Sequence, residues 1–161
     1  MFGRLHRVVE SVTRTTQGSL GPAEAMFAAD EASARLGIEL VESGAGKAVC
    51  RMRVTRAMVN GHGIAHGGHL FLLADTAFAC ACNSRGPVTV AAGADIAFVA
   101  PVHEDDVLTA TAEERILFGR NGVYDVTVRR GDVVVAEFRG RSRAVGGGAG
   151  RLQHPRSRDD R

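Results

Sequence analysis

The sequence has no tryptophan and a single tyrosine, and aromatic residues make up 5% of its 161 positions. So few rings offer no platform on which nucleic-acid bases stack, and a formal net charge of +2 is too small to attract a polyanion. No nucleic-acid partner is therefore expected. The hydrophobic content of 45% and the charged content of 24% are those of a soluble globular protein, long enough for one domain with its own core.

Cysteine is scarce too, and its count of 3 is odd, which does not suit a disulfide framework. Cys80 and Cys82 lie close together on an expected helix and point to different faces, so we expect a reducing, cytoplasmic location. The most apolar stretch, residues 70–82, is too short to span a bilayer. The basic N-terminal stretch lacks the apolar core of a secretory signal, and no membrane partner is expected.

A loop rich in glycine and histidine, followed by an apolar helix, is the most informative part of the chain. Between Leu70 and Cys82 nearly every side chain is apolar or small, which predicts a helix buried on all sides. Asp75 interrupts it, and an ionised carboxylate is costly there unless it is paired or used in chemistry. Gly67 and Gly68 stand at the expected first turn, where they let another group approach free N–H donors that suit an anion or a polarised carbonyl oxygen.

The spacing of these two features predicts a dimer. Gly67 and Asp75 are eight residues apart, which along a helix axis is ~12 Å. A carbonyl group that binds the N–H and is attacked with the help of the carboxylate must lie within roughly 3 Å of each. One helix cannot supply both groups, whereas a second copy related by a two-fold axis can. We therefore expect a composite site in an obligate dimer.

The remaining chain predicts an α+β architecture. A helix is expected from Pro22 to Gly37. Strands are expected over residues 38–43, 47–55, 88–100, 106–118, 123–129 and 133–144. Side chains alternate along 106–118 and 123–129, and the glycine turn at residues 119–122 between them predicts a hairpin. Short connections make them mainly antiparallel neighbours in one curved sheet, with the long helix against one face.

Three regions are expected along the chain. Residues 1–21 form a poorly ordered N-terminal extension, residues 22–145 the folded domain, and residues 146–161 a disordered tail rich in arginine and glycine.

A metal site is the strongest alternative for the histidines. His62, His66 and His69 have a spacing that suits metal ligands. However, His66 and His69 straddle the expected helix start, and Asp75 lies beyond reach in the same chain. We therefore expect neither a metal nor another cofactor. For Asn60, the alternative to a role in catalysis is a cap that bonds the backbone of its own loop.

The central stretch of the chain closely resembles the PaaI group of hotdog acyl-CoA thioesterases, which is associated with phenylacetate degradation. The resemblance lies in residues 59–84, VNGHGIAHGGHLFLLADTAFACACNS, where the loop, the glycine pair and Asp75 have the same spacing as in that group. The likeness extends into residues 106–112, 122–125 and 138–140 and covers residues 22–145. It implies the hotdog fold, a curved antiparallel sheet wrapped around one long central helix. It also implies hydrolysis of an aryl- or hydroxyarylacetyl-CoA thioester without a metal, in a homodimer or a dimer of dimers.

The same resemblance implies roles for individual residues. Gly67 donates its N–H to the thioester oxygen, and Asp75 of the facing subunit is the base or the nucleophile. Asn60 and His66 position the loop and the substrate. Many relatives carry a serine or threonine on the strand after the helix, whereas residues 91–94 here read Ala-Ala-Gly-Ala, with Thr89 the nearest hydroxyl.

Substrate binding is expected from residues of the long helix, of the hairpin at residues 119–122 and of the last strand. Arg139 and Arg141 share one face of the last strand, where a guanidinium suits a CoA phosphate, although charged residues also protect sheet edges. The other expected substrate-binding residues are Gly68, Thr76, Arg120, Gly122 and Gly140.

Other activities remain open at this point. The same fold could hydrolyse another aromatic thioester, such as hydroxybenzoyl- or dihydroxynaphthoyl-CoA. A hotdog dehydratase uses an acid and a histidine on a hydroxyacyl thioester, but the register of His66, Gly67 and Asp75 favours the hydrolase. A non-catalytic acyl-CoA sensor is expected to carry a DNA-binding segment, and the tail from Gly146 is too short and too mixed in charge for one.

Overall fold

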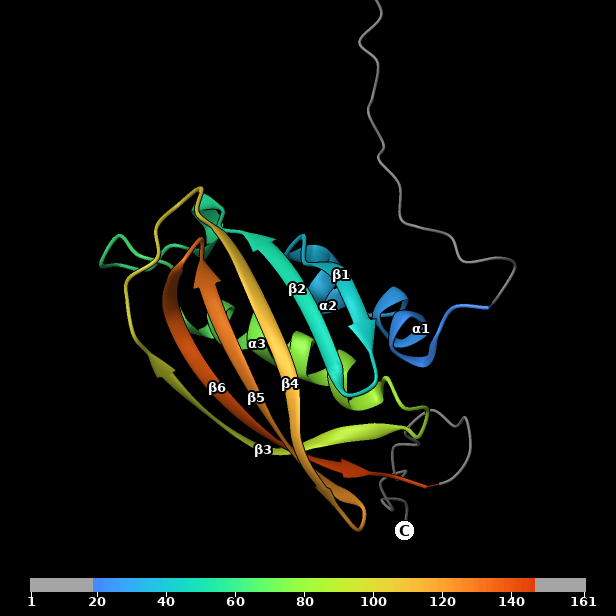
Figure 1. Cartoon of the computed structure of the whole chain (residues 1–161). Helices are drawn as coiled ribbons and strands as arrows, with labels where there is room; N and C mark the ends of the chain where they lie inside the picture. Colours follow the sequence, from blue (N-terminus) through green and yellow to red (C-terminus); the bar gives the residue numbers. More distant parts are fainter. Residues whose placement is uncertain (1–18, 147–161) are drawn as a thin grey trace, which may run out of the picture.

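The computed structural model describes residues 19–146 (Figure 1). Its helices are α1 (Pro22–Ala28), α2 (Glu31–Arg35), the 3-10 turn η1 (Arg56–Met58) and α3 (Gly67–Asn83). Its strands are β1 (Glu39–Gly44), β2 (Lys47–Arg53), β3 (Thr89–Phe98), β4 (Val107–Phe118), β5 (Asn121–Arg130) and β6 (Val133–Ala144). The predictions for residues 1–18 and 147–161 lie outside the described residues.

All six strands join one antiparallel sheet in the order β1-β2-β4-β5-β6-β3. β1 and β2, β4 and β5, and β5 and β6 form hairpins, and the predicted turn at Gly119 and Arg120 connects β4 to β5, with Gly119 at a φ of 58°. The sheet curves around α3, which lies against its inner face (Figure 1). The predicted α+β architecture, a curved antiparallel sheet around one long helix, is confirmed.

The core lies between α3 and the inner face of the sheet. Phe78 of α3 stacks edge-on against Tyr124 and tilts against Phe138, with ring centroids 5.4 and 5.8 Å apart. Its ring lies so close to Gly140 that a Cβ there would meet it at 2.8 Å. The side chains that alternate inward from the central strands are fully buried, including Cys50, Met52, Leu108, Ala110, Ala112, Val126 and Val128.

The N-terminal helix differs from the prediction. The single helix expected from Pro22 to Gly37 is wrong, because the chain breaks at Asp30 into α1 and α2. Backbone hydrogen bonds that span only three residues end α1. The carboxylate of Asp30 then accepts the Ser33 N–H at 3.0 Å and so caps α2.

The long helix is also less enclosed than expected. Its residues facing the sheet are buried, but Gly68, Phe71, Leu72, Asp75 and Ala79 form a stripe that stays partly open to solvent in the single chain. The sheet covers one side of α3 and covers this stripe only in part. Among the described residues no helix is both long and apolar enough to cross a membrane.

Candidate active site

The first turn of α3 presents a free backbone donor. His66 caps the helix, and its ring Nδ1 accepts the Gly68 N–H at 3.0 Å. The His66 N–H donates to the Met58 carbonyl at 2.8 Å, and this bond fixes the position at which the chain enters α3. The Gly67 N–H has no acceptor within residues 19–146. At the positive end of a helix, this N–H is available to a carbonyl oxygen or an oxyanion.

The loop before α3 is held by Asn60. Its side-chain oxygen accepts the N–H groups of His62 at 2.8 Å and Ile64 at 3.4 Å, and its own N–H donates to the Ile64 carbonyl at 2.8 Å. A β-bridge between Val59 and Ala65 closes the loop. Asn60 is therefore a loop cap, and together with His66 it sets the position of Gly67.

Asp75 is a half-buried carboxylate without a partner. In the described chain it accepts no hydrogen bond and has no cation within 4.0 Å, although its side chain lies on the open stripe of α3. Burial raises its pKa, and the negative charge of Asp30 adds to this effect. A carboxyl group that is unpaired, held on a rigid helix and made more basic is suited to act as a base or a nucleophile.

Thr76 turns away from this stripe. It is buried, and its hydroxyl lies 2.9 Å from the Ser33 hydroxyl on α2. Substrate contact by Thr76 stays a prediction, since the hydroxyl is already engaged inside the protein.

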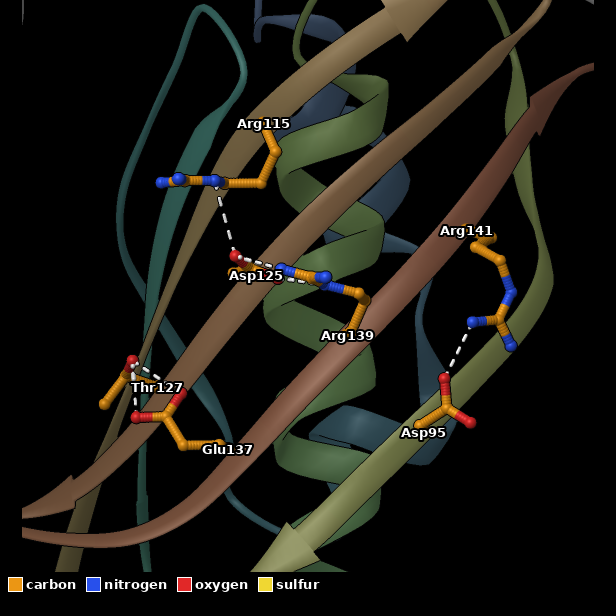
Figure 2. A network of polar contacts seen from close by, with 7 residues as sticks. All are labelled: Asp95, Arg115, Asp125, Thr127, Glu137, Arg139 and Arg141. Carbon is orange, nitrogen blue, oxygen red and sulfur yellow. Dashed lines mark hydrogen bonds and ion pairs between the residues drawn. The ribbon is translucent and has the colours of Figure 1, made fainter.

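The predicted phosphate-binding arginines lie on the outer face of the sheet (Figure 2). Arg139 donates two hydrogen bonds, of 2.7 and 2.9 Å, to Asp125, and Arg115 forms an ion pair with the same carboxylate at 3.4 Å. Arg141 donates to Asp95 at 2.7 Å. Asp95, Arg115, Asp125 and Arg139 line an open hollow of about 710 Å³, whereas Arg141 does not. Binding of CoA phosphates here stays a prediction, and it requires the pairs to open.

The predicted residues of the β4–β5 hairpin have structural contacts of their own. Arg120 donates twice to the Ala144 carbonyl, at 2.8 and 3.1 Å, which ties the hairpin to the end of β6. A Cβ at Gly122 would meet the Ser142 hydroxyl at 2.8 Å and Leu117 at 2.9 Å, so close packing accounts for glycine there.

A single chain does not bring the predicted residues together. Asn60, His66, Gly67 and Gly68 gather at the head of α3, and Asp75 lies about two turns further along the same helix. The remaining predicted residues lie elsewhere, at Arg120 and Gly122 of the hairpin, Gly140 on the inner face of β6, and Arg139 and Arg141 on its outer face.

Two neighbours of the site were not predicted from the sequence. The ring of Phe98 lies against Gly67, so that a Cβ on Gly67 would come within 2.7 Å of it, and Phe98 is 55% exposed. No local sequence pattern predicts the contact between Phe98 and Gly67. Asp30 is the second neighbour, and its cap pattern with Ser33 was a signal that the sequence did contain.

The histidines show no metal-binding cluster. His66 and His69 have ring centroids 6.4 Å apart at nearly a right angle. Over the described residues, no three side chains of histidine, cysteine, aspartate or glutamate are placed to hold one ion.

Comparison with known proteins gives consistent matches. The family model described as the thioesterase superfamily matches residues 62–137. The acyl-coenzyme A thioesterase PaaI of Escherichia coli is 47% identical over 126 residues, which span 78% of this chain and 90% of that protein.

Solved structures agree. That of E. coli PaaI, from the phenylacetic acid degradation operon, superimposes with a TM-score of 0.76 at 46% identity, over 78% of this chain and 92% of the other. A mutant of the phenylacetic acid degradation protein PaaI from Thermus thermophilus gives 0.70 at 34% identity, over 72% and 100%. A hypothetical thioesterase of Streptococcus pneumoniae, solved with coenzyme A, gives 0.65 at 26% identity, over 68% and 86%.

Proposed function

Because the chain belongs to the PaaI group of hotdog-fold acyl-CoA thioesterases, it is a thioester hydrolase, and we propose that its substrates are aryl- or hydroxyarylacetyl-CoA thioesters. The hotdog fold expected from the sequence is confirmed. The aryl preference is supported by the origin of E. coli PaaI in a phenylacetic acid degradation operon. The described cysteines are free and buried, which supports the cytoplasm as the compartment of the reaction.

One observation supports the mechanism more than any other: α3 carries a backbone donor, the Gly67 N–H, and a carboxylate, that of Asp75, neither of which has a partner among residues 19–146. The thioester oxygen accepts the Gly67 N–H, which stabilises the negative charge that develops on this oxygen. Asp75 of the partner subunit takes a proton from water, and the oxygen of that water forms the new bond to carbon. The carbon–sulfur bond then breaks, and the thiolate of CoA receives the proton.

The partner subunit is required by the distance between the two groups. In α3 they are ~12 Å apart along the axis, so they cannot serve one carbonyl group from the same chain. Three features support a two-fold contact here. β3 is an edge strand with β6 on one side only. Phe98, which lies against Gly67, and the next residue Val99 are 55% and 59% exposed. The stripe of α3 around Asp75 is partly exposed in the single chain. The assembly is a homodimer or a dimer of dimers.

Direct attack by Asp75 is the second route to the same products. A single turnover in ¹⁸O-labelled water separates the routes. If Asp75 activates water, the label enters the acid product in the first turnover. If Asp75 attacks, it forms a mixed anhydride, and water that cleaves this anhydride at the Asp75 carboxyl carbon leaves an unlabelled oxygen in the first product and places the label on Asp75. Label found on Asp75 therefore identifies this route.

A thiol-release assay over a set of acyl-CoA substrates tests the proposed function. We expect kcat/KM for phenylacetyl- or hydroxyphenylacetyl-CoA to exceed that for straight-chain acyl-CoA by about tenfold or more, the discrimination that an apolar pocket can supply. Hydroxybenzoyl- and dihydroxynaphthoyl-CoA belong in the same set as the alternative substrates. Equal or higher kcat/KM with straight chains would contradict the aryl preference. Double-bond formation without free thiol would indicate a dehydratase.

A further inference from the structure

The junction between α1 and α2 is connected to the active helix by buried hydrogen bonds. Asp30 accepts the Ser33 N–H at 3.0 Å and the Ser33 hydroxyl at 2.5 Å. The same hydroxyl lies 2.9 Å from that of Thr76, and both Ser33 and Thr76 are buried. Thr76 directly follows Asp75 in α3. A continuous polar chain therefore joins the cap of α2 to the turn of α3 that carries the carboxylate.

Asp30 also brings a negative charge into this neighbourhood. Like Asp75 it is half-buried, and within residues 19–146 neither carboxylate has a cation within 4.0 Å. After burial itself, the charge of Asp30 is the second cause that raises the pKa of Asp75. Two carboxylates that both lack a cationic partner, on segments that pack together, repel each other, and the repulsion is relieved when Asp75 takes up a proton.

Among the charged groups of the described chain, Asp30 is the one whose charge raises the pKa of Asp75. Glu114 is paired with Arg85, and the Tyr124 hydroxyl also donates to it. Glu24 on α1 accepts the Ser43 hydroxyl. The thiols of Cys50 on β2 and of Cys80 and Cys82 on α3 are buried, and the ring of His69 on α3 lies edge-on to that of His66.

We propose that Asp30 is a positioning residue of the active site, anchored through Ser33 and Thr76, and that it keeps a second negative charge beside Asp75 during the reaction. This inference rests on the proposed role of Asp75. The fixed charge makes the Asp75 carboxylate a stronger base, and it favours the step in which Asp75 accepts the proton from water. The N-terminal helices would then serve the chemistry as well as the packing of α3.

The pH dependence of kcat/KM tests the proposal. Asp30→Asn keeps a good cap for α2 and removes the charge. We expect its acid limb to move to lower pH and its plateau to fall, because Asp75 becomes a weaker base. Glu31→Gln is the matched control, since it removes an exposed acid from the next position. Its acid limb should remain in place. An Asp30→Asn profile that coincides with the wild-type profile would overturn the proposal.

A measurement without substrate separates this proposal from the proposed function. In the folded protein, the ¹³C resonance of the Asp75 carboxyl, assigned from its loss in Asp75→Asn, should titrate at lower pH in Asp30→Asn than in the wild type. Ser33→Ala keeps the charge but frees the Asp30 carboxylate, and it should give a smaller shift in the same direction. If the resonance does not move, Asp30 has no such role, even when Asp75→Asn is inactive. If Asp75→Asn is active, the proposed role of Asp75 fails, and the catalytic role of Asp30 fails with it.

Discussion

Two half-buried carboxylates in this protein have opposite surroundings. Asp125 on the outer face of the sheet accepts two hydrogen bonds from Arg139 and lies close to Arg115. These contacts lower the pKa of Asp125, and the hydrogen bonds from Arg139 contribute most. Asp75 on α3 has no cation or donor in the described chain, and burial and Asp30 raise its pKa. Partial burial alone therefore does not identify a functional acid. The informative property is a carboxylate that the fold holds in place and leaves unpaired.

The largest expected effect separates these two residues by activity. Asp75→Asn should lower kcat at least ~100-fold, the scale of losing a general base. The matched variant Asp125→Asn should keep kcat within about twofold, because that carboxylate holds the outer face together. Steady-state thiol release measures both, and circular dichroism verifies that both fold. Near-normal turnover of Asp75→Asn would remove it from the mechanism.

A second comparison isolates the backbone donor at the head of α3. Gly67→Ala and Gly67→Pro both add a Cβ against Phe98, but only proline removes the N–H. Proline is tolerated at a first helical position, and His66, with φ −63° and ψ 131°, suits a following proline. We expect kcat of Gly67→Pro to lie about 100-fold below that of Gly67→Ala. Equal activities would mean that the N–H does not take part.

The same carboxylates should also differ in their effect on stability. The lowered pKa of Asp125 stabilises the fold above the carboxyl's unfolded pKa, and this contribution is lost as pH falls through its folded value. The raised pKa of Asp75 destabilises the fold above its folded value, and this effect disappears at lower pH. At pH 7 we expect Asp125→Asn to lower Tm by about 1–3 °C and Asp75→Asn to raise it. Scanning calorimetry at pH 7 and at a pH below both folded pKa values should show both differences shrinking in acid.

The smallest expected effect concerns the outer arginines. Since Arg139 is engaged by Asp125, we expect Arg139→Gln to leave KM for acyl-CoA within about twofold and to change the stability of the fold little, because the pair is exposed to solvent. A KM that rises severalfold with kcat unchanged would instead support the predicted contact with a CoA phosphate. Lys47→Gln removes an exposed, weakly paired cation from β2 and serves as the control.

The sequence predicted those features that depend on neighbouring residues. The apolar run of α3, the alternation along the strands and the glycine turn at Gly119 are local, and the structure has each of them. The break at Asp30 was missed because residues on both sides of it favour a helix. The pairing of Arg139 was missed because it depends on strand register, which places Arg139 opposite Asp125. The closeness of Asp30 to Asp75 arises only when α2 packs on α3.

The central claim is that each reaction centre takes Gly67 from one chain and Asp75 from the other. Mixed dimers test this claim most directly. A chain with Asp75→Asn and a chain with Gly67→Pro are each expected to be inactive alone. Refolded together in equal amounts, they should recover about a quarter of wild-type activity, because half of the dimers are mixed and each of these has one intact centre. If the mixture stays as inactive as its parents while refolded wild type recovers fully, the shared centre is contradicted.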